Sequence, residues 1–369
     1  MTPEMKIGMV TAFLGNLRAG TWTYTWNLLK QLRERPGFAA IDREQRLLPG
    51  LGDIDVKAYP GGGDLLAKFF WPNFTLPDKA AAEGFDLVHC TTPYGTFRKT
   101  GYKKIITICD VTPLLFPETH GRMNVWHHRF VLPAILKQAD HIITISEASR
   151  ADIIRCFKMQ EDKVTVTLLA ADRMFKPAPD GIPGDDVVNL PRPYILNVGT
   201  LEPRKNLAGL LRAFAAARRR GLQQKLVITG ARGWGNSPLA GLVRDLALDD
   251  AVVFTGFVDD NDLPHLYKGA DFFVYPSLYE GFGLPILEAM GCGTPVITSN
   301  VSSMPEVAGD AALLVDPRSD EELASAMLGM AGDGGLRAGM REQGIIQASR
   351  FSWEKTAQDT LAVYGKVLA

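Results

Sequence analysis

The chain has 369 residues, 46% of them hydrophobic, which is enough for two separate cores and too long for one ordinary domain. Its 40 basic and 41 acidic residues leave a net charge of -1, so no overall positive field recruits nucleic acid. The four cysteines lack metal-ligand spacing, and no stretch approaches the roughly 18 apolar residues of a membrane span. We expect a two-domain cytoplasmic protein.

The first half of the chain alternates short β-branched runs with helical patterns. An opening strand and helix unit, with a helix from Trp22 to about Glu34, is followed by further strands predicted at 86–90, 104–109, 141–145 and 164–168. Such continuous apolar strands are typical of a parallel sheet covered by helices on both faces. Ligands bind beyond the carboxyl ends of strands in these sheets. The residues directly after the strands are therefore expected to line a cleft.

A linker and a second set of strands complete the pattern. Residues 172–193 contain five prolines and two glycines without a clear period, which indicates an interdomain linker. Strands are predicted beyond it at 194–198, 225–229, 251–255, 272–275, 295–298 and 312–315. We therefore predict two doubly wound α/β domains, at 1–171 and 194–352, followed by an amphipathic helix at 353–369.

The chain is organised around the run from Tyr275 to Glu288, which ends a strand, turns on two glycines and opens a helix near Pro285. The bare backbone of Gly281, Phe282, Gly283 and Leu284, with the positive end of the helix dipole, can cradle a phosphate. Carboxylates accept hydrogen bonds from the many hydroxyl groups of sugar and ribose, so Glu280 and Glu288 suit a nucleotide sugar. The alternative is that both carboxylates only serve the turn and the helix start.

A second strand end carries two adjacent cations, Arg204 and Lys205, before a helix start. Cations there oppose the helix dipole, and an anion between them would resolve the conflict. A diphosphate leaving group fits that role, because Arg204 can bind phosphate bidentately and Lys205 as a point charge. The alternative is a solvated basic turn. The aspartates of 259–262 are better explained by a helix N-cap at Asn261 or Asp262 than by a metal site.

These motifs together resemble the family 4 retaining glycosyltransferases, which have the GT-B architecture of two Rossmann-like domains facing each other across a cleft. The resemblance rests on the two glutamates around Gly281–Leu284 and on Lys205, and it reaches over most of the chain. It implies that Gly20 lies near the donor phosphates, that the backbone near Val258 approaches the base, and that the terminal helix packs back on the first domain. It also implies that cations of the protein, and no metal or other cofactor, neutralise the diphosphate.

Two positions depart from the family pattern. Thr200 stands where many members have an arginine after the glycine, and Arg204 can take over that role. Cys109 stands where a histidine usually precedes the aspartate of this motif, so the resemblance transfers no general base here. Asp110 is predicted as an active-site or acceptor-side residue, with a turn aspartate as the alternative. The histidines lack ligand spacing, and His127 with its neighbour is the least certain of them.

The resemblance implies transfer of a hexose from a nucleotide diphosphate sugar to a hydroxyl group of a glycan or lipid-linked glycan acceptor. Mannose from GDP-mannose is the first expectation, in polysaccharide synthesis. Glu280 would position the transferred sugar, Glu288 would bind the ribose, and a donor phosphate oxygen would accept the proton of the acceptor. Alternatives are a non-catalytic nucleotide-sugar-binding protein and an epimerase. The aromatic stretch at 69–74 packs under its own loop or contacts an acceptor or a membrane.

Overall fold

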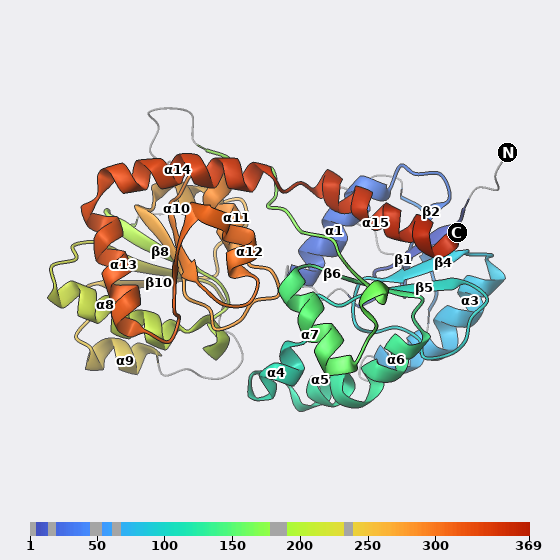
Figure 1. The fold of residues 1–369 in the computed structure, drawn as a ribbon. Helices are drawn as coiled ribbons and strands as arrows, with labels where there is room; N and C mark the ends of the chain where they lie inside the picture. The colour runs from blue at the N-terminus through green and yellow to red at the C-terminus, as the bar shows by residue number, and fades with distance from the viewer. Residues whose placement is uncertain (1–4, 14–19, 45–53, 61–67, 178–189, 232–238) are drawn as a thin grey trace. The chain divides into compact units, whose positions relative to one another are not determined.

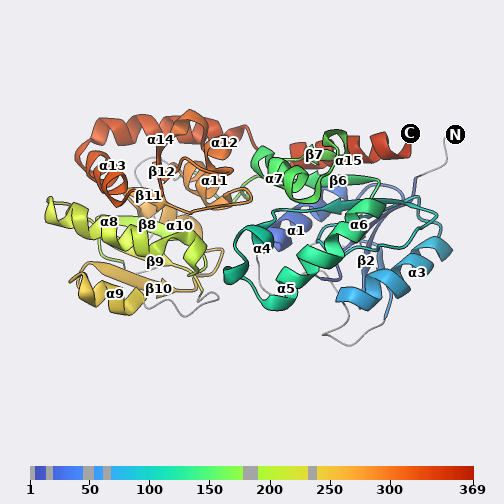
Figure 2. The ribbon, with the colours of Figure 1, turned by 60° about the horizontal axis from the view of Figure 1, so that its bottom comes forward.

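The computed structural model of the protein describes residues 5–13, 20–44, 54–60, 68–177, 190–231 and 239–369. The chain divides into two compact units, which Figures 1 and 2 draw as ribbons. Unit 1 comprises Met1–Pro117, Gly121–Leu169 and Ser352–Ala369, and unit 2 comprises Glu118–His120 and Ala170–Phe351. No helix in the described part of the chain is both long and apolar enough to cross a membrane.

Unit 1 is built on a parallel sheet, which among the described residues has seven strands in the order β3-β2-β1-β4-β5-β6-β7. The strands are β1 (Ile7–Val10), β2 (Phe38–Asp42), β3 (Val56–Ala58), β4 (Leu87–Cys90), β5 (Lys103–Thr107), β6 (His141–Thr144) and β7 (Val164–Val166). The order reverses between β1 and β4, because the chain first builds outward to β3 and then returns. Ligands of doubly wound sheets bind at this kind of reversal, beyond the carboxyl ends of the strands.

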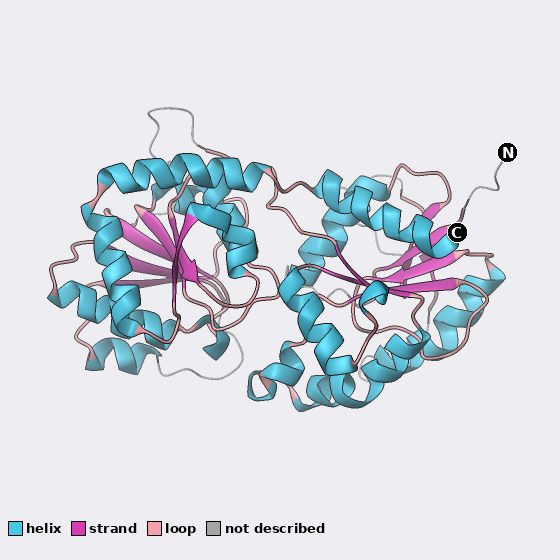
Figure 3. Cartoon of the chain, in the orientation of Figure 1, coloured by secondary structure: helices cyan, strands magenta, loops and turns pink. Residues whose placement is uncertain are grey.

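Helices cover both faces of the first sheet, shown with its strands in magenta in Figure 3. They are α1 (Gly20–Leu32), η1 (Trp71–Thr75), α3 (Leu76–Ala82), α4 (Thr112–Leu115), η2 (Pro117–Thr119), α5 (Arg122–Trp126), η3 (His127–Val131), α6 (Leu132–Gln138), α7 (Glu147–Phe157), η4 (Glu161–Lys163) and α15 (Trp353–Leu368). The pair α1 and α15 packs on one face. Side chains of α3, α6 and α7 form a core with the strands on the other, among them Ala80, Leu136 and Ile153.

The terminal helix α15 is anchored in unit 1 by buried polar side chains. Nδ1 of His89, on β4, is 2.7 Å from the Tyr364 hydroxyl, and its Nε2 is 2.7 Å from the Thr107 hydroxyl. The Tyr24 hydroxyl of α1 lies 3.0 Å from the same Thr107 oxygen. Near the other end of α15, Thr356 Oγ1 donates to the Leu168 carbonyl at 2.6 Å. Each of these five side chains therefore has a partner, which offsets the cost of taking its polar atoms out of water.

Unit 2 repeats the plan with a parallel sheet that has six strands among the described residues, in the order β10-β9-β8-β11-β12-β13. The strands are β8 (Tyr194–Val198), β9 (Lys225–Thr229), β10 (Val252–Gly256), β11 (Phe272–Tyr275), β12 (Val296–Ser299) and β13 (Ala312–Val315). Strand order here reverses between β8 and β11, so these two neighbours frame the position where a ligand is expected.

Helices again cover both faces. They are η5 (Pro203–Lys205), α8 (Leu207–Arg219), α9 (Leu239–Asp245), α10 (Leu263–Gly269), α11 (Leu284–Gly291), α12 (Met304–Ala308), η6 (Gly309–Ala311), α13 (Asp320–Gly332) and α14 (Gly334–Ser349). The core beneath α8, α9 and α13 includes Leu210, Phe214 and Met327, with side chains from every strand of the sheet. On the other face α10, α11 and α12 pack side by side, and α14 packs on α11.

The predicted fold class is confirmed for both units, since each is a parallel α/β sheet with helices on two faces. Two strands, β2 and β3, are absent from the sequence prediction. The central motif is corrected in one detail. A helix that opens near Pro285 would hold Glu288 in its first turn, but α11 begins at Leu284 and Glu288 begins the second turn. Much of the predicted linker, residues 178–189, lies outside the described residues.

Candidate functional site

The loops after β8 and β11 meet at the strand reversal of unit 2. Leu278 N donates to the Arg204 carbonyl at 2.8 Å, which joins the two loops directly. The backbone is tight where the first loop begins, because a Cβ on Gly230 would lie 2.0 Å from the Gly199 carbonyl oxygen. Gly230 follows β9, and only glycine leaves room for this close approach of the two backbones.

Glu280 binds both cations. Its Oε1 lies 2.6 Å from Lys205 Nζ, and its Oε2 lies 2.8 Å from the Nη1 of Arg204. Arg204 also forms an ion pair with Glu202 and donates to the Tyr279 carbonyl at 2.6 Å. The Tyr275 hydroxyl completes the group, at 2.6 Å from Lys205 Nζ and 2.9 Å from Glu280 Oε1. Two cations and two carboxylates thus form one compact network.

The charges in this network fix one another. Burial alone would raise the pKa of Glu280, but Lys205 and Arg204 overcome that effect and lower it to about 2. Burial disfavours a charged Arg204 too, and Glu280 and Glu202 nevertheless raise its pKa. For Lys205 burial prevails, and its pKa falls below the usual range even though Glu280 opposes the change. Glu280 and Arg204 are therefore held in their charged forms, whereas burial works against the charge of Lys205.

This arrangement changes one sequence-based argument. We expected the two cations to need an external anion because they would sit in a helix start. They lie instead in the separate turn η5, before α8 begins at Leu207, and the anion between them is Glu280, while Glu202 pairs with Arg204 alone. A diphosphate that binds here must compete with carboxylates of the protein for Arg204 and Lys205.

Two serines hold the turn that carries Glu280. Ser302 Oγ donates to the Glu280 carbonyl at 2.6 Å, and Ser303 Oγ lies within hydrogen-bond distance of the same carbonyl (2.9 Å) and of the Phe282 carbonyl (2.7 Å). Gly283 then takes a left-handed conformation, with φ of 104°, and starts α11 without a side-chain cap. Within the described residues no side chain caps this helix start, and the N-terminus of a helix favours anions. The predicted phosphate cradle of Gly281–Leu284 has this backbone geometry.

Glu288 has a different environment on the same helix. Its Oε2 accepts a hydrogen bond of 2.8 Å from the Tyr267 hydroxyl, on α10. Burial raises the pKa of Glu288 to about 7, with Asp260 and Asp172 adding to the rise and the bond from Tyr267 opposing it. Near neutral pH this carboxyl group is thus divided between its neutral and ionised forms.

The other predicted site residues are more dispersed. Val258, in the loop after β10, is half-buried, and the nearby Asp260 lies within electrostatic reach of Glu288. Gly20 and Asp110 belong to unit 1. Gly20 is the exposed first residue of α1, and its preceding turn, 14–19, lies outside the described residues. Asp110 is half-buried after β5, and its Oδ1 accepts from Thr112 N at 2.9 Å and from Thr112 Oγ1 at 2.5 Å. These hydrogen bonds are those of a turn aspartate, which was the alternative considered for Asp110 from the sequence.

The aspartate cluster forms local bonds. Asp259 Oδ1 accepts from the backbone and side-chain nitrogens of Asn261, each at 3.0 Å. Asp262 occupies the N-cap position of α10, although its side chain makes no capping hydrogen bond. Across the described ranges no group of three or more histidine, cysteine, aspartate or glutamate side chains is arranged to hold a metal ion.

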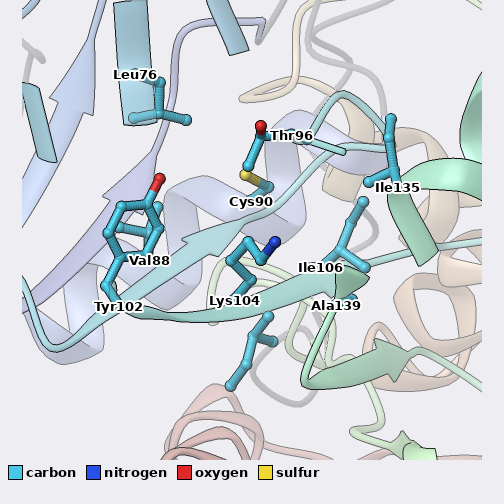
Figure 4. Close-up of a pocket in the computed structure, with 11 residues that line it drawn as sticks. Leu76, Val88, Cys90, Thr96, Tyr102, Lys104, Ile106, Ile135 and Ala139 are labelled. Atoms are coloured by element: carbon cyan, nitrogen blue, oxygen red, sulfur yellow. The ribbon is translucent and has the colours of Figure 1, made fainter. Parts of the chain in front are cut away.

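Unit 1 also contains a small cavity between its sheet and helices, shown in Figure 4. Cys90 and Lys104, from the neighbouring strands β4 and β5, line it together with apolar side chains such as Ile106 and Ile135. The Lys104 ammonium already donates to the Arg98 carbonyl at 2.7 Å. The lining offers little for a polar substrate, so we read this cavity as a packing gap in the core.

Comparison with solved structures defines the class of protein. The structure of Alr3699/HepE from Anabaena in complex with UDP and glucose aligns over 98% of this chain and 100% of its own. The TM-score is 0.77 at 19% identity. The lipopolysaccharide glycosyltransferase WaaG aligns over 97% of this chain and 99% of its own, with a TM-score of 0.70 at 14% identity. Both likenesses are of fold. The chain has the GT-B fold.

Sequence comparison identifies the family. The model for "Glycosyltransferase Family 4" matches residues 18–172, and the model for "Glycosyl transferases group 1" matches residues 183–347. The O-antigen chain mannosyltransferase B of Escherichia coli is 38% identical over 71% of this chain and 70% of its own. The serotype-specific mannosyltransferase WbdA of the same species is 31% identical, but this chain spans only 33% of its length. The chain belongs to glycosyltransferase family 4 and is a hexosyltransferase.

The sequence analysis assigned no role to several residues of the unit 2 site. Glu202 is two residues before Arg204, and Tyr275 is the last residue of β11, so both stand inside motifs that had been singled out. Their types gave the available signal, because a carboxylate beside a buried cation and a tyrosine at a strand end both favour hydrogen bonding. Tyr267 carried no such signal, since only the packing of α10 on α11 brings it to Glu288.

Proposed function

We propose that the protein is a retaining mannosyltransferase that moves mannose from GDP-mannose to a hydroxyl group of a glycan or lipid-linked glycan acceptor in O-antigen or related polysaccharide synthesis. The observation that carries this proposal is the contact of Glu280 with both Arg204 and Lys205 at the strand reversal of unit 2. The mannosyltransferase relatives support the choice of sugar. The reaction takes place at the cytoplasmic side of a membrane, which the protein contacts at most peripherally.

In this proposal the donor diphosphate is bound by Arg204, Lys205 and the backbone N–H groups of Gly281–Leu284. These groups oppose the negative charge that grows on the leaving group as the glycosidic bond breaks. Because Glu280 is the partner of both cations in the free protein, a bound diphosphate releases part of its carboxylate toward the sugar hydroxyls. Binding of the diphosphate to Arg204 and Lys205 thus coincides with release of the Glu280 carboxylate toward the sugar.

Glu288 serves the nucleotide half in its ionised form, as acceptor for the ribose hydroxyls, and the backbone near Val258 meets the base. The acceptor hydroxyl attacks the anomeric carbon from the face that the diphosphate leaves. Its proton passes to a phosphate oxygen of the donor, so no protein base is required. Asp110 and Gly20, in unit 1, are proposed to lie on the acceptor side and near the donor phosphates, respectively. No metal ion or other cofactor takes part.

Product analysis tests the proposal. The purified protein is incubated with GDP-mannose, and in parallel with UDP-glucose and UDP-N-acetylglucosamine, in the presence of a mannose-containing acceptor. Release of GDP with a new α-mannosidic linkage, seen by nuclear magnetic resonance, is the expected result. Thermal shift against the same panel gives an independent readout, since a ligand at 100 times its dissociation constant adds about 2.7 kcal/mol to the free energy of unfolding.

Other results would assign a different function. Tight binding of one nucleotide sugar without release of its diphosphate, in the presence of every acceptor tried, would indicate a non-catalytic binding protein. A changed sugar still attached to its nucleotide would indicate an epimerase. Transfer from a UDP-sugar in place of GDP-mannose would keep the reaction and replace the donor.

A further inference from the structure

Aromatic side chains gather at the strand reversal of unit 1. The neighbouring strands β1 and β4 end at Val10 and Cys90, and Phe13 and Tyr94 follow them. The ring centroids of Phe13 and Tyr94 are 5.5 Å apart. The Tyr94 ring also lies 4.7 Å from the imidazole of His127, on η3. We call Phe13, Tyr94 and His127 the aromatic cluster. It occupies the position where a doubly wound sheet binds its ligand.

The cluster has a rigid base and an accessible side. Trp71 is 1% exposed, meets the Phe13 ring edge-on at 5.6 Å, and donates from Nε1 to the Tyr59 carbonyl at 2.6 Å. Phe13 and Tyr94 are both half-buried. Part of each ring therefore remains accessible while the buried indole fixes their positions. Such preorganised rings lose little conformational entropy when a ligand packs on them.

The third member of the cluster, His127, is a buried side chain. It is 8% exposed, and in the described part of the chain neither Nδ1 nor Nε2 has a partner. The adjacent His128 differs, since its Nδ1 lies 2.9 Å from the Asn124 carbonyl. Thr92, two residues before Tyr94, is 5% exposed, and its hydroxyl also has no partner among the described residues. Unpaired buried polar groups cost stability, so this pair calls for an explanation.

The chemistry of these groups selects a class of ligand. Burial lowers the pKa of His127 to about 4, and His128 and Lys68 add to the effect, so the ring is neutral at pH 7. A neutral imidazole offers one donor and one acceptor, and a threonine hydroxyl offers both. A hexopyranose matches this set, because its hydroxyl groups also donate and accept and its C–H face is apolar enough to pack on a ring. The nearest cation recorded at the cluster, Lys68 Nζ, already lies 4.8 Å from the Tyr94 ring centroid.

We propose that the aromatic cluster, with Thr92, binds a hexopyranose unit of the acceptor glycan, Tyr94 stacking on the sugar and His127 bonding its hydroxyl groups. This inference rests on the proposed function and names the residues that recognise the acceptor. His127 and Tyr94 are binding residues here, and none of the cluster exchanges a proton in the reaction. The unpaired imidazole lowers the stability of the protein, and its hydrogen bonds to the bound sugar offset this cost.

Two substitutions separate this role from simple packing. His127→Leu and Tyr94→Ala should each raise the acceptor KM about tenfold or more, the effect of losing one hydrogen bond or one ring contact. The donor KM and the slow hydrolysis of GDP-mannose by water should not change. His127→Gln should recover part of the acceptor affinity, because an amide also offers a donor and an acceptor. The unfolding midpoint of His127→Leu should stay level or rise, since an unpaired polar group is removed.

Trp126→Ala is the matched control, because Trp126 precedes His127 directly and is 49% exposed. It should leave the acceptor KM unchanged. Methyl α-mannoside is the probe for a free sugar, and the same mannoside on an alkyl chain is the probe for a lipid-linked one. Equal KM effects with both probes assign the cluster to the sugar alone, and an effect confined to the alkyl mannoside would overturn the assignment in favour of an alkyl-binding role.

Saturation-transfer resonance with methyl α-mannoside gives a readout that does not depend on turnover. Saturation transfer from the wild-type protein to the mannoside, lost in His127→Leu and Tyr94→Ala, supports the site even if GDP-mannose is not the donor. Unchanged acceptor KM and unchanged saturation transfer in both variants would show that the cluster is only packed core. Absence of GDP-mannose binding and hydrolysis in the wild type would instead count against the proposed function.

Discussion

The two units place different chemistry at the same topological position. At the strand reversal of unit 2, Glu280, Arg204 and Lys205 form ion pairs, and each charge has a partner at 2.8 Å or less. At the reversal of unit 1, Tyr94 and the neutral His127 meet without an ion pair, and the imidazole has no partner among the described residues. Topology thus fixes where a ligand binds, and the side chains decide which part of a glycosyl transfer reaction each sheet can serve.

The difference also appears in how the key groups of each site are paired. In unit 2, carboxylates of the protein pair with the cations. In unit 1, the His127 imidazole and the Thr92 hydroxyl have no partner among the described residues, at a cost in stability. Loss of the Glu280 charge in unit 2 should therefore lower stability and turnover together, whereas His127→Leu in the aromatic cluster of unit 1 should lower acceptor affinity without loss of stability.

The largest effect is expected for Glu280→Gln. The change leaves Arg204 and Lys205 buried without their shared counter-charge, which costs about 3–5 kcal/mol of unfolding free energy. Turnover should fall on the order of 100-fold or more, because the sugar loses its carboxylate partner. Affinity for GDP should not fall, since the freed cations have no internal competitor. Calorimetry with GDP and steady-state kinetics measure both. A loss of GDP affinity with normal turnover would contradict these assignments.

Acid unfolding sharpens the same test. The pKa of Glu280 is lowered to about 2 in the folded protein, below its ordinary value of 4.5. Its ion pairs therefore stabilise the fold fully above pH 4.5, and this contribution is lost as the pH falls toward 2. Glu280→Gln lacks a titrating group at this position, so its unfolding free energy should depend less on pH in that window than that of the wild type.

Lys205→Ala should have the next largest effect. It removes one preorganised charge from the proposed diphosphate site, and losses on the order of 100-fold in turnover follow from removal of one such group. Glu280 keeps Arg204 as its partner, so the fold should survive. Lys205→Arg is the control that preserves the charge but not the compact ammonium. Turnover within a few-fold of the wild type in Lys205→Ala would assign the diphosphate to other residues.

A smaller and pH-dependent effect is expected for Glu288→Gln. The pKa of Glu288 is raised to about 7, so the ionised form that can accept two ribose hydroxyl groups becomes dominant only above that pH. Affinity for GDP-mannose should accordingly rise between pH 6 and pH 8 in the wild type. The variant should bind about tenfold more weakly at pH 8 and show no such rise. Calorimetry at the two pH values tests this, and an equal pH dependence in both proteins would exclude Glu288 as its origin.

The smallest effect should come from a chelator. We attribute neutralisation of the diphosphate to Arg204, Lys205 and backbone N–H groups, so activity should be unchanged after treatment with EDTA. A fall in activity that magnesium or manganese reverses would return the aspartates of 259–262 to consideration as a metal site. Mutation of Asp259, whose carboxylate bonds Asn261, would then be the next step.

The sequence predicted most of the strands and the main charged residues of the site, because buried parallel strands and glycine turns leave strong local patterns. It missed β2, whose residues Phe38–Asp42 include two alanines and an aspartate and so lack the usual β-branched run. It could not predict that Glu280 binds both cations, since that depends on how the loops after β8 and β11 pack. The sequence also left the role of His127 undecided, because its contact with Tyr94 depends on packing.

The anchoring of α15 has a consequence for the order in which the chain folds. His89, on the central strand β4, obtains its partner from Tyr364, which is separated from it by the whole of unit 2 along the chain. During synthesis from the N-terminus, every residue of unit 2 leaves the ribosome before α15 does. Unit 2 can thus complete its core while one face of the unit 1 sheet is covered by α1 without α15. Unit 1 is therefore the first unit to be synthesised and the last to complete its fold.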